Sequence, residues 1–575
     1  MVFAALALAP LFLFWHGAGW LGTRFVARLW NRPSLLDIDG MTLVLVGLIL
    51  TSMLAMCVAI FRPLSAGVTY AMMSAIVLGL ALDRSCWLAT RRQRWRKLAP
   101  GDLAPWAVAG FAAICFSALA IAECRNFDTG LYHAQAVRWL REWGYVPGLG
   151  NLHGRLAFNS SWFALSALCN VGPLADHVHH VINLVPIALG FGLAMKHLRA
   201  PAQELSTRHL FAFAVLVPCF FHRWDCGSFS PDLWAAVAFL LLAGAVIRRL
   251  ELEHVMRPGG EAEVERAEWE ILLLSCYLPT VKLTVAPGAA LGLFALLTMR
   301  RQPFTFVITA LAGIALMVPF LFSNYLLSGY VVYPLPGLDL FEADWKIPHE
   351  QVVQMSRTLK QWVLLPGAYS WNSVMPPMRQ WIGPWLEYYW RTNPQSLVMI
   401  AAFFPLQLLG LCLAFRRNRR EGLLFMAVTL SLFLGLLYWF CLSPDPRYGL
   451  GWMAAGVAWP TAWLLQWVAN TSERRKAIVV RGVFAIVLVV GLASLRSGLR
   501  VNPTSNLSLL GRPLTPLPEG PTRPWTTPEG LVIHIASDQF QQAWNAPLPS
   551  APAPCDVALR GHELGNGFRA VIRSK

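Results

Sequence analysis

Long uncharged apolar segments alternate along the chain with short clusters of basic residues. Segments 41–61 and 304–322 carry no charged residue, and each is close to the roughly 20 residues that a helix needs to cross a bilayer. Basic clusters such as 91–97 and 416–420 lie beside such segments, and lysine and arginine gather on the cytoplasmic side of membrane proteins. The pattern predicts an all-α polytopic membrane protein of about 14 transmembrane helices, with both chain ends external.

The basic clusters also predict which connections are external. Cluster 91–97 precedes the apolar segment 105–123, so this segment runs outward and residue 128 lies outside the membrane. Segment 160–172 is short for a span and is expected to be re-entrant or interfacial. The charged stretch 248–270 is expected to be a cytoplasmic loop. The expected external loops are 124–180, 222–232, 323–395 and 443–449.

The last part of the chain has a different character. From residue 500 it is rich in proline, and at 531–535 apolar and polar residues alternate. Such alternation is typical of a strand. We therefore expect residues 500–575 to form a small external domain with some β structure.

Composition argues against a soluble globular protein and against a nucleic-acid-binding protein. The chain is 56% hydrophobic and 14% charged, whereas about 25% of the residues in ordinary globular domains are charged. The net charge of +16 does not indicate a nucleic-acid-binding protein, because most cations flank apolar segments and do not form one polar face.

The 11 cysteines are scattered and lack the spacing of a zinc site. A disulfide between the external Cys124 and Cys226 stays an open alternative.

The segment 126–135, Asn-Phe-Asp-Thr-Gly-Leu-Tyr-His-Ala-Gln, places several reactive side chains directly after a predicted span. Asp128 is followed by Tyr132 at i+4 and by His133, at the start of an amphipathic helix. A carboxylate at this place can take the proton of a hydroxyl that attacks a sugar carbon. The alternative is structural, because an aspartate before a helical stretch is also typical of an N-cap.

Three cationic positions are candidates for binding a phosphate. Lys282 interrupts an apolar stretch, and a cation inside the membrane is costly and therefore a functional candidate. Arg447 is held between prolines in a short external loop, and its planar guanidinium suits a phosphate; an ordinary salt bridge with Asp445 is the alternative. His153 and Arg155 follow Asp128 in the same external loop and are further candidates.

The remaining polar positions are less specific. Asp225 is a candidate second acid that binds the acceptor or a metal, whereas Asp232 is expected to cap a helix. Asp128 and Asp225 would be the ligands of a magnesium or manganese ion, although nothing in the sequence requires one. The histidines at 177–180 are too crowded for one helical face and indicate a polar turn. The aromatic residues of 323–395 favour an acceptor groove or an interfacial belt.

Taken together, these motifs show a resemblance to a known family. The segment 126–136 resembles the first external loop of the GT-C glycosyltransferases, polytopic enzymes that use sugars linked to polyprenyl phosphate. The Pro-Asp-Pro-Arg-Tyr segment 444–448 is similar to their short external Pro-x-x-Arg-Tyr turn, and 278–282 to their lysine-bearing span. The resemblance implies that Asp128 is the catalytic base. Tyr132, His133 and Tyr448 are expected to bind substrate. One difference is that three additional spans precede the acid.

The resemblance implies transfer of a sugar from a polyprenyl-phosphate donor to an external glycan or lipid acceptor, with inversion at the anomeric carbon. The expected domains are extra N-terminal helices (1–103), a GT-C-like catalytic module (104–499) and the external domain. An arginine- and alanine-rich composition favours a bacterial inner membrane, with the site facing the periplasm. The alternatives are an O-antigen polymerase or ligase, and a flippase or transporter of lipid-linked sugars without chemistry.

Overall fold

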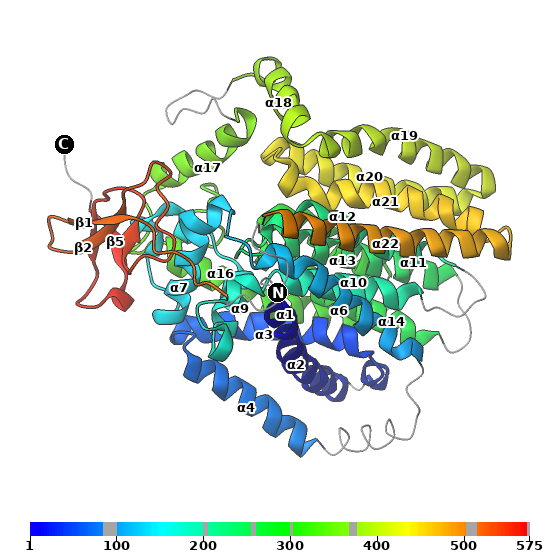
Figure 1. Ribbon diagram of the computed structural model, residues 1–575, viewed down its shortest axis with the longest axis horizontal. Helices are drawn as coiled ribbons and strands as arrows, with labels where there is room; N and C mark the ends of the chain where they lie inside the picture. The colour runs from blue at the N-terminus through cyan, green and yellow to red at the C-terminus, as the bar shows by residue number, and fades with distance from the viewer. Residues whose placement is uncertain are drawn as a thin grey trace.

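The computed structural model describes residues 1–30, 32–83, 100–198, 205–254, 260–299, 303–366, 376–501 and 514–571. The basic cluster 91–97 lies outside these residues. Long helices run side by side along the longest axis of the molecule, and the C-terminal strands lie at one end of it (Figure 1). The predicted helical fold with a small C-terminal β region is therefore confirmed.

Among the described residues, eight helices are long and apolar enough to cross a membrane, and four further apolar helices are shorter. The expected number of about 14 spans is thus not confirmed. The outward faces of these helices are apolar: Leu430 is 55% exposed, Val489 64% and Leu492 54%. A soluble monomer rarely exposes such continuous apolar surface, which supports placement in a membrane.

Close contact between helix backbones holds the N-terminal part together. Helix α2 (Leu8–Leu29) packs along α3 (Gly40–Phe61). A Cβ on Gly19 would lie 2.0 Å from the carbonyl oxygen of Leu43, and one on Gly47 would lie 1.7 Å from that of Trp15. Glycine is therefore required where the two backbones touch, as is typical of helix pairs in membranes.

The main bundle is built from helices that are distant in the sequence. Helix α6 (Pro100–Ala120) packs against α10 (Leu184–Leu198) and α22 (Glu473–Val501), and α13 packs against α14 and α21. The other long helices and their bounds are α13 (Asp232–His254), α14 (Glu261–Val281), α15 (Ala286–Met299), α16 (Pro303–Ser328), α19 (Pro394–Arg417), α20 (Arg419–Leu442) and α21 (Pro446–Ala469).

One expectation from the sequence is wrong. The stretch 248–270 is not a loop throughout, because α13 continues to His254 and α14 begins at Glu261. Ion pairs Arg248–Glu270 and Arg249–Glu268 join these two helices. Residues 207–221, which precede α13, form α11 (Thr207–Phe211), a 3-10 turn and α12 (Leu216–Phe221).

Segment 160–172 contains α9 (Ser161–Cys169), whose nine residues are all buried. Nine residues rise by roughly 14 Å, less than half of the hydrocarbon core of about 30 Å. Helix α9 therefore does not cross the membrane by itself, which agrees with the expectation of a re-entrant or interfacial segment. The other short helices are α1 (Val2–Leu6), α4 (Ala66–Leu82), α7 (Ala134–Glu142) and α8 (Leu149–Leu152).

The predicted loop 323–395 is partly helical, with α17 (His349–Leu364) and α18 (Met378–Thr392). In the C-terminal region, β1 (Thr522–Thr526) is antiparallel to β2 (Val532–Ala536), and β3 (Ser550–Ala551) is parallel to β2. Strands β4 (Val557–Leu559) and β5 (Phe568–Ala570) form a separate antiparallel pair. The strand expected at 531–535 is therefore confirmed as β2. These strands and α7 lie at the same end of the molecule (Figure 1).

Candidate functional site

Asp128 directly precedes a π-helix, Thr129–His133, which leads into α7. The π-helix has i→i+5 hydrogen bonds and is frequent at functional sites. Its wider turn brings Asp128 and His133, five residues apart, to the same side, whereas the sequence indicated an ordinary helical turn. The side chain of Asp128 makes no capping hydrogen bond, so the alternative of a structural N-cap is wrong.

The carboxylate of Asp128 instead binds two arginines. Oδ2 accepts from Nη1 of Arg447 at 3.1 Å, and Oδ1 lies 3.6 Å from Nη1 of Arg155. The Asp128 side chain is only 14% exposed. Burial by itself would raise the pKa of Asp128, but the charges of Arg447 and Arg155 outweigh it and lower the pKa below its ordinary value. Asp128 is therefore ionised at neutral pH.

Arg447 is fixed by its own loop. Pro446 occupies the first turn of α21, a position that proline favours, and Asp445 accepts from the backbone N–H of Arg447 at 3.0 Å. The Arg447 guanidinium lies 3.4 Å from Asp445 Oδ2 and donates to the Tyr448 hydroxyl at 2.6 Å. It also lies 5.0 Å from the ring of Trp362 on α17. The predicted Asp445 pair is thus present, in addition to the contact with Asp128.

Lys282 lies in the short connection between two helices. Helix α14 ends at Val281, Lys282 is extended (φ −160°, ψ 133°), and α15 begins at Ala286. The sequence predicted this division into two halves. The Lys282 ammonium forms an ion pair with Asp232, the first residue of α13, and lies 4.1 Å from the centre of the Tyr448 ring.

Asp232 was expected only to cap a helix, and its role as the partner of Lys282 was missed. The signal was available in the sequence, because one apolar segment begins with an acid and another is interrupted by a lysine. Ionisable groups within apolar membrane segments normally pair with each other.

These groups surround one cavity of about 570 Å³, within the usual range for a ligand site. Of the residues expected to bind substrate or phosphate, those that line the cavity are Asp128, Tyr132, His133, Arg155, Lys282 and Tyr448. Apolar residues line other parts of the wall, among them Leu283, Ala286, Met317, Phe320, Leu321 and Leu442. Lys360 of α17 also lines the cavity and has no ion-pair partner within the part of the chain that the structure describes. The sequence did not indicate Lys360.

Three expected site residues do not line the cavity. Arg447 lies beside it and contacts Asp128 and Tyr448, which do line it. His153 does not line the cavity, and burial lowers its pKa to about 3, so it is uncharged and unsuited to bind phosphate at neutral pH. Asp225 accepts from Asn126 at 2.8 Å and contacts His222 at 2.9 Å. It therefore does not form a metal pair with Asp128. No group of three or more histidines, cysteines, aspartates or glutamates is arranged to hold a metal ion among the described residues.

Three other sequence alternatives are decided by the structure. Cys124 and Cys226 are free thiols, so the conceivable disulfide is absent. His179 and His180 lie in a 3-10 turn, Val178–His180, which His177 directly precedes. In the aromatic-rich segment, Trp381, Trp385 and Tyr389 are buried against the neighbouring protein. They support the Arg447 loop, since Trp385 donates to the Pro444 carbonyl at 3.0 Å, and they do not form an open groove.

The C-terminal region docks on the segment that carries Asp128. The backbone N–H of Trp544 donates to the Gly130 carbonyl at 2.8 Å, and the Gln542 amide donates to the Phe127 carbonyl at 2.8 Å. These bonds hold the backbone on both sides of Asp128. A Cβ on Gly130 would lie 2.5 Å from the Trp544 ring, so only glycine fits under this contact.

Replacing Gly130 with alanine is expected to destabilise the protein by about 1–3 kcal/mol, because the new methyl group collides with the rigid Trp544 ring. Gly110 is the matched control. A Cβ at that helical position meets nothing within 4 Å, so Gly110→Ala should leave stability unchanged or raise it by up to about 1 kcal/mol. Thermal unfolding in detergent measures both variants. Equal stability of the two variants would contradict the tight contact.

The buried His133 predicts a loss of stability in acid. Burial lowers its pKa from 6.5 to about 4. Between these pH values the unfolded chain binds more protons than the folded protein. The contribution of His133 to the free energy of unfolding is therefore fully present above pH 6.5 and falls as the pH drops toward 4, by at most about 1.4 kcal/mol per pH unit. We expect His133→Gln to flatten the thermal stability profile in this window. An unchanged slope would show that His133 is not buried in its neutral form.

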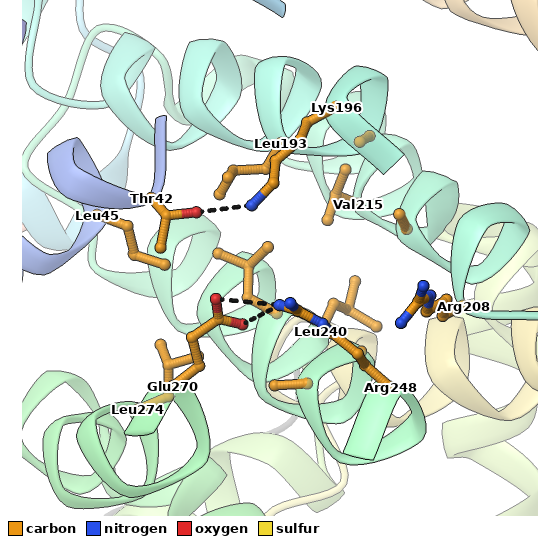
Figure 2. A pocket seen from close by; sticks show the side chains of 15 residues that line it. Thr42, Leu45, Leu193, Lys196, Arg208, Val215, Leu240, Arg248, Glu270 and Leu274 are labelled. Atoms are coloured by element: carbon orange, nitrogen blue, oxygen red, sulfur yellow. Dashed lines mark hydrogen bonds and ion pairs between the residues drawn. The ribbon is translucent and has the colours of Figure 1, made fainter. Parts of the chain in front are cut away.

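A second cavity, of about 40 Å³, lies near Thr42, Lys196 and Arg248 (Figure 2). Arg248 follows Asp232 by 16 residues on α13, roughly 24 Å at 1.5 Å per residue, so this cavity is near the other end of that helix. Each cation that lines it faces a carboxylate, in the pairs Lys196–Asp39, Arg208–Glu251 and Arg248–Glu270. With its charges balanced, this cavity is a poor site for an anion.

Comparison with known proteins gives a family and no activity. No curated protein and no solved structure matches the chain. The model of a family described as a domain of unknown function (DUF8201) matches residues 1–454. The match includes all residues that line the cavity, from Asp128 to Tyr448 in the sequence, and ends before the C-terminal strands. Because it spans more than half of the chain, the protein belongs to the DUF8201 family.

Proposed function

We propose that this protein is a membrane glycosyltransferase that moves a sugar from a polyprenyl-phosphate donor to an external glycan or lipid acceptor. The observation that carries the proposal is the meeting of an ionised carboxylate, Asp128, with Arg155 and Lys282 at one cavity with partly apolar walls, beside which Arg447 contacts Asp128. The carboxylate can act as a general base, and the cations can bind the phosphate of an anionic lipid.

The charges at the cavity suit a donor with one negative charge. Within the described residues, four cations lie in or beside the cavity and three carboxylates accompany them, which leaves one net positive charge. The cations are Arg155, Lys282, Lys360 and Arg447, and the carboxylates are Asp128, Asp232 and Asp445. A sugar linked to polyprenyl phosphate is a phosphodiester with a single negative charge, and its isoprenoid chain fits apolar walls.

The proposed reaction is a single displacement. The acceptor oxygen attacks the anomeric carbon, Asp128 takes the hydroxyl proton, and the bond from the anomeric carbon to the phosphate oxygen breaks. The electron pair leaves with the phosphate, where Arg447 and Lys282 neutralise the developing charge. A phosphate needs no general acid to depart, so one carboxylate suffices. The arriving phosphate also competes with Asp128 for Arg447, which frees the carboxylate to act as a base.

The experiment uses purified protein in detergent with radiolabelled hexoses and pentoses linked to short polyprenyl phosphates, and with methyl glycosides as acceptors. Transfer of label to a methyl glycoside supports the proposal. Movement of the lipid-linked sugar across the bilayer of liposomes, without release of the sugar from its carrier lipid, would identify a flippase or transporter. Activity only with diphosphate-linked oligosaccharides would identify a polymerase or ligase. Both of these outcomes overturn the proposal.

A further inference from the structure

A chain of hydrogen bonds begins at His133 in the cavity wall and leads away from it. His133 Nδ1 lies 3.3 Å from the Thr129 hydroxyl, which lies 2.9 Å from Asn126 Oδ1. Asn126 Nδ2 lies 2.8 Å from Asp225 Oδ1, and the other oxygen of Asp225 lies 2.9 Å from His222 Nδ1. All five side chains are buried or partly buried, and the proposed reaction uses none of these contacts.

The directions of the bonds in the middle of this chain follow from the backbone N–H of Thr129 and the amide of Asn126. The backbone N–H of Thr129 donates to Asn126 Oδ1 at 2.9 Å, so this atom is the amide oxygen and Nδ2 donates to Asp225. The Thr129 hydroxyl also donates to Asn126 Oδ1. With its hydrogen on Asn126, the hydroxyl presents a lone pair to His133 Nδ1, and the tautomer that satisfies this contact carries the ring hydrogen on Nδ1.

The opposite nitrogen of His133 is therefore bare. His133 is neutral at neutral pH, because burial lowers its pKa to about 4. The charged groups that act on it are Asp128 and Asp232, which raise the pKa, and Lys282 and Arg447, which lower it. Nε2 accepts no hydrogen bond from any residue that the structure describes, although the imidazole lines the cavity. It is a fixed acceptor without a donor.

We propose that Nε2 of His133 accepts a hydrogen bond from a second, non-reacting hydroxyl of the sugar acceptor, beside the hydroxyl that Asp128 deprotonates. This inference rests on the proposed function and adds the acceptor class: a molecule with neighbouring hydroxyls, such as a glycan. A bare nitrogen attracts a hydroxyl hydrogen and repels the lone pairs of a phosphate, carboxylate or carbonyl oxygen. The donor phosphate therefore binds at Lys282 and Arg447 and not at His133.

Thr129, Asn126 and Asp225 are positioning residues in this scheme, because they hold the tautomer of His133 without contact with substrate. Their effect is on recognition. Throughout the displacement His133 keeps its protonation state, and the proton of the attacking hydroxyl goes to Asp128.

Kinetics with the labelled donor and methyl glycosides test the proposal. In His133→Gln the amide can turn its N–H groups toward the acceptor, so the acceptor KM should rise about 5- to 100-fold, and more than the donor KM. Thr129→Val, which releases the tautomer, should act in the same direction, and Thr129→Ser should restore the wild-type value. His562→Gln, in the exposed C-terminal segment, is the matched control. A rise in donor KM alone, or no change, overturns the proposal.

A second measurement does not depend on activity. In protein labelled with ¹⁵N-histidine, the signals of His133 are assigned by their loss in His133→Gln. We expect a protonated Nδ1 and a bare Nε2, a change of this state in Thr129→Val, and a shift of Nε2 when methyl glycoside is added. A protonated Nε2, or no shift with glycoside, overturns the inference. If wild-type protein transfers no sugar, the proposed function fails, yet this titration still decides whether His133 binds a hydroxyl.

Discussion

Asp128→Asn is expected to lower sugar transfer at least about 100-fold, the contribution of a positioned general base. The amide keeps the size of the carboxylate and loses its ability to take a proton. Folding should be retained, because Arg447 still contacts Asp445 and Tyr448. The measurement is the initial rate of transfer from the labelled polyprenyl-phosphate donor at saturating acceptor, together with the thermal unfolding of the variant.

Asp176→Asn is the matched control for this variant. Asp176 lies further along segment 124–180, binds Arg141 at 2.5 Å, and has a left-handed backbone (φ 61°) that asparagine also tolerates. It should transfer sugar at the wild-type rate. A wild-type rate in Asp128→Asn would refute the assignment of the base, and equal losses in both variants would show that the charge of the segment, and not its chemistry, matters.

Lys282→Met is expected to destabilise the protein by about 3–5 kcal/mol, because it leaves Asp232 as a buried charge without its partner. Asp232 is 6% exposed. Transfer should also fall, since the donor phosphate loses a cation. Unfolding in detergent and transfer rates measure the two effects, which a single variant cannot separate.

The double variant Lys282→Met with Asp232→Asn separates them. It removes both charges and keeps similar volumes, so much of the lost stability should return. Transfer should stay low, because the ammonium of Lys282 is still missing. Recovery of both stability and transfer would show that the ion pair is purely structural. An unstable double variant would show instead that the cost of Lys282→Met does not come from an unpaired Asp232.

The sequence alone determined the features that depend on local pattern. Uncharged segments near the length of a bilayer predicted apolar helices, because a backbone in lipid must satisfy its own hydrogen bonds. The break at Lys282 and the strand at β2 followed from charge and alternation in neighbouring residues. The number of spans did not follow, since short buried helices such as α9 have the same composition as parts of spans.

Only the tertiary structure decided which of these residues meet. Asp128 and Arg447 are 319 positions apart, and Lys282 and Asp232 are 50 apart; no local pattern encodes such distances. The π-helix that places His133 beside Asp128 lies under the docked C-terminal region. The side chains were visible in the sequence, but their pairing depends on how distant helices pack, because an ion pair forms only where the fold brings both charges within a few ångströms.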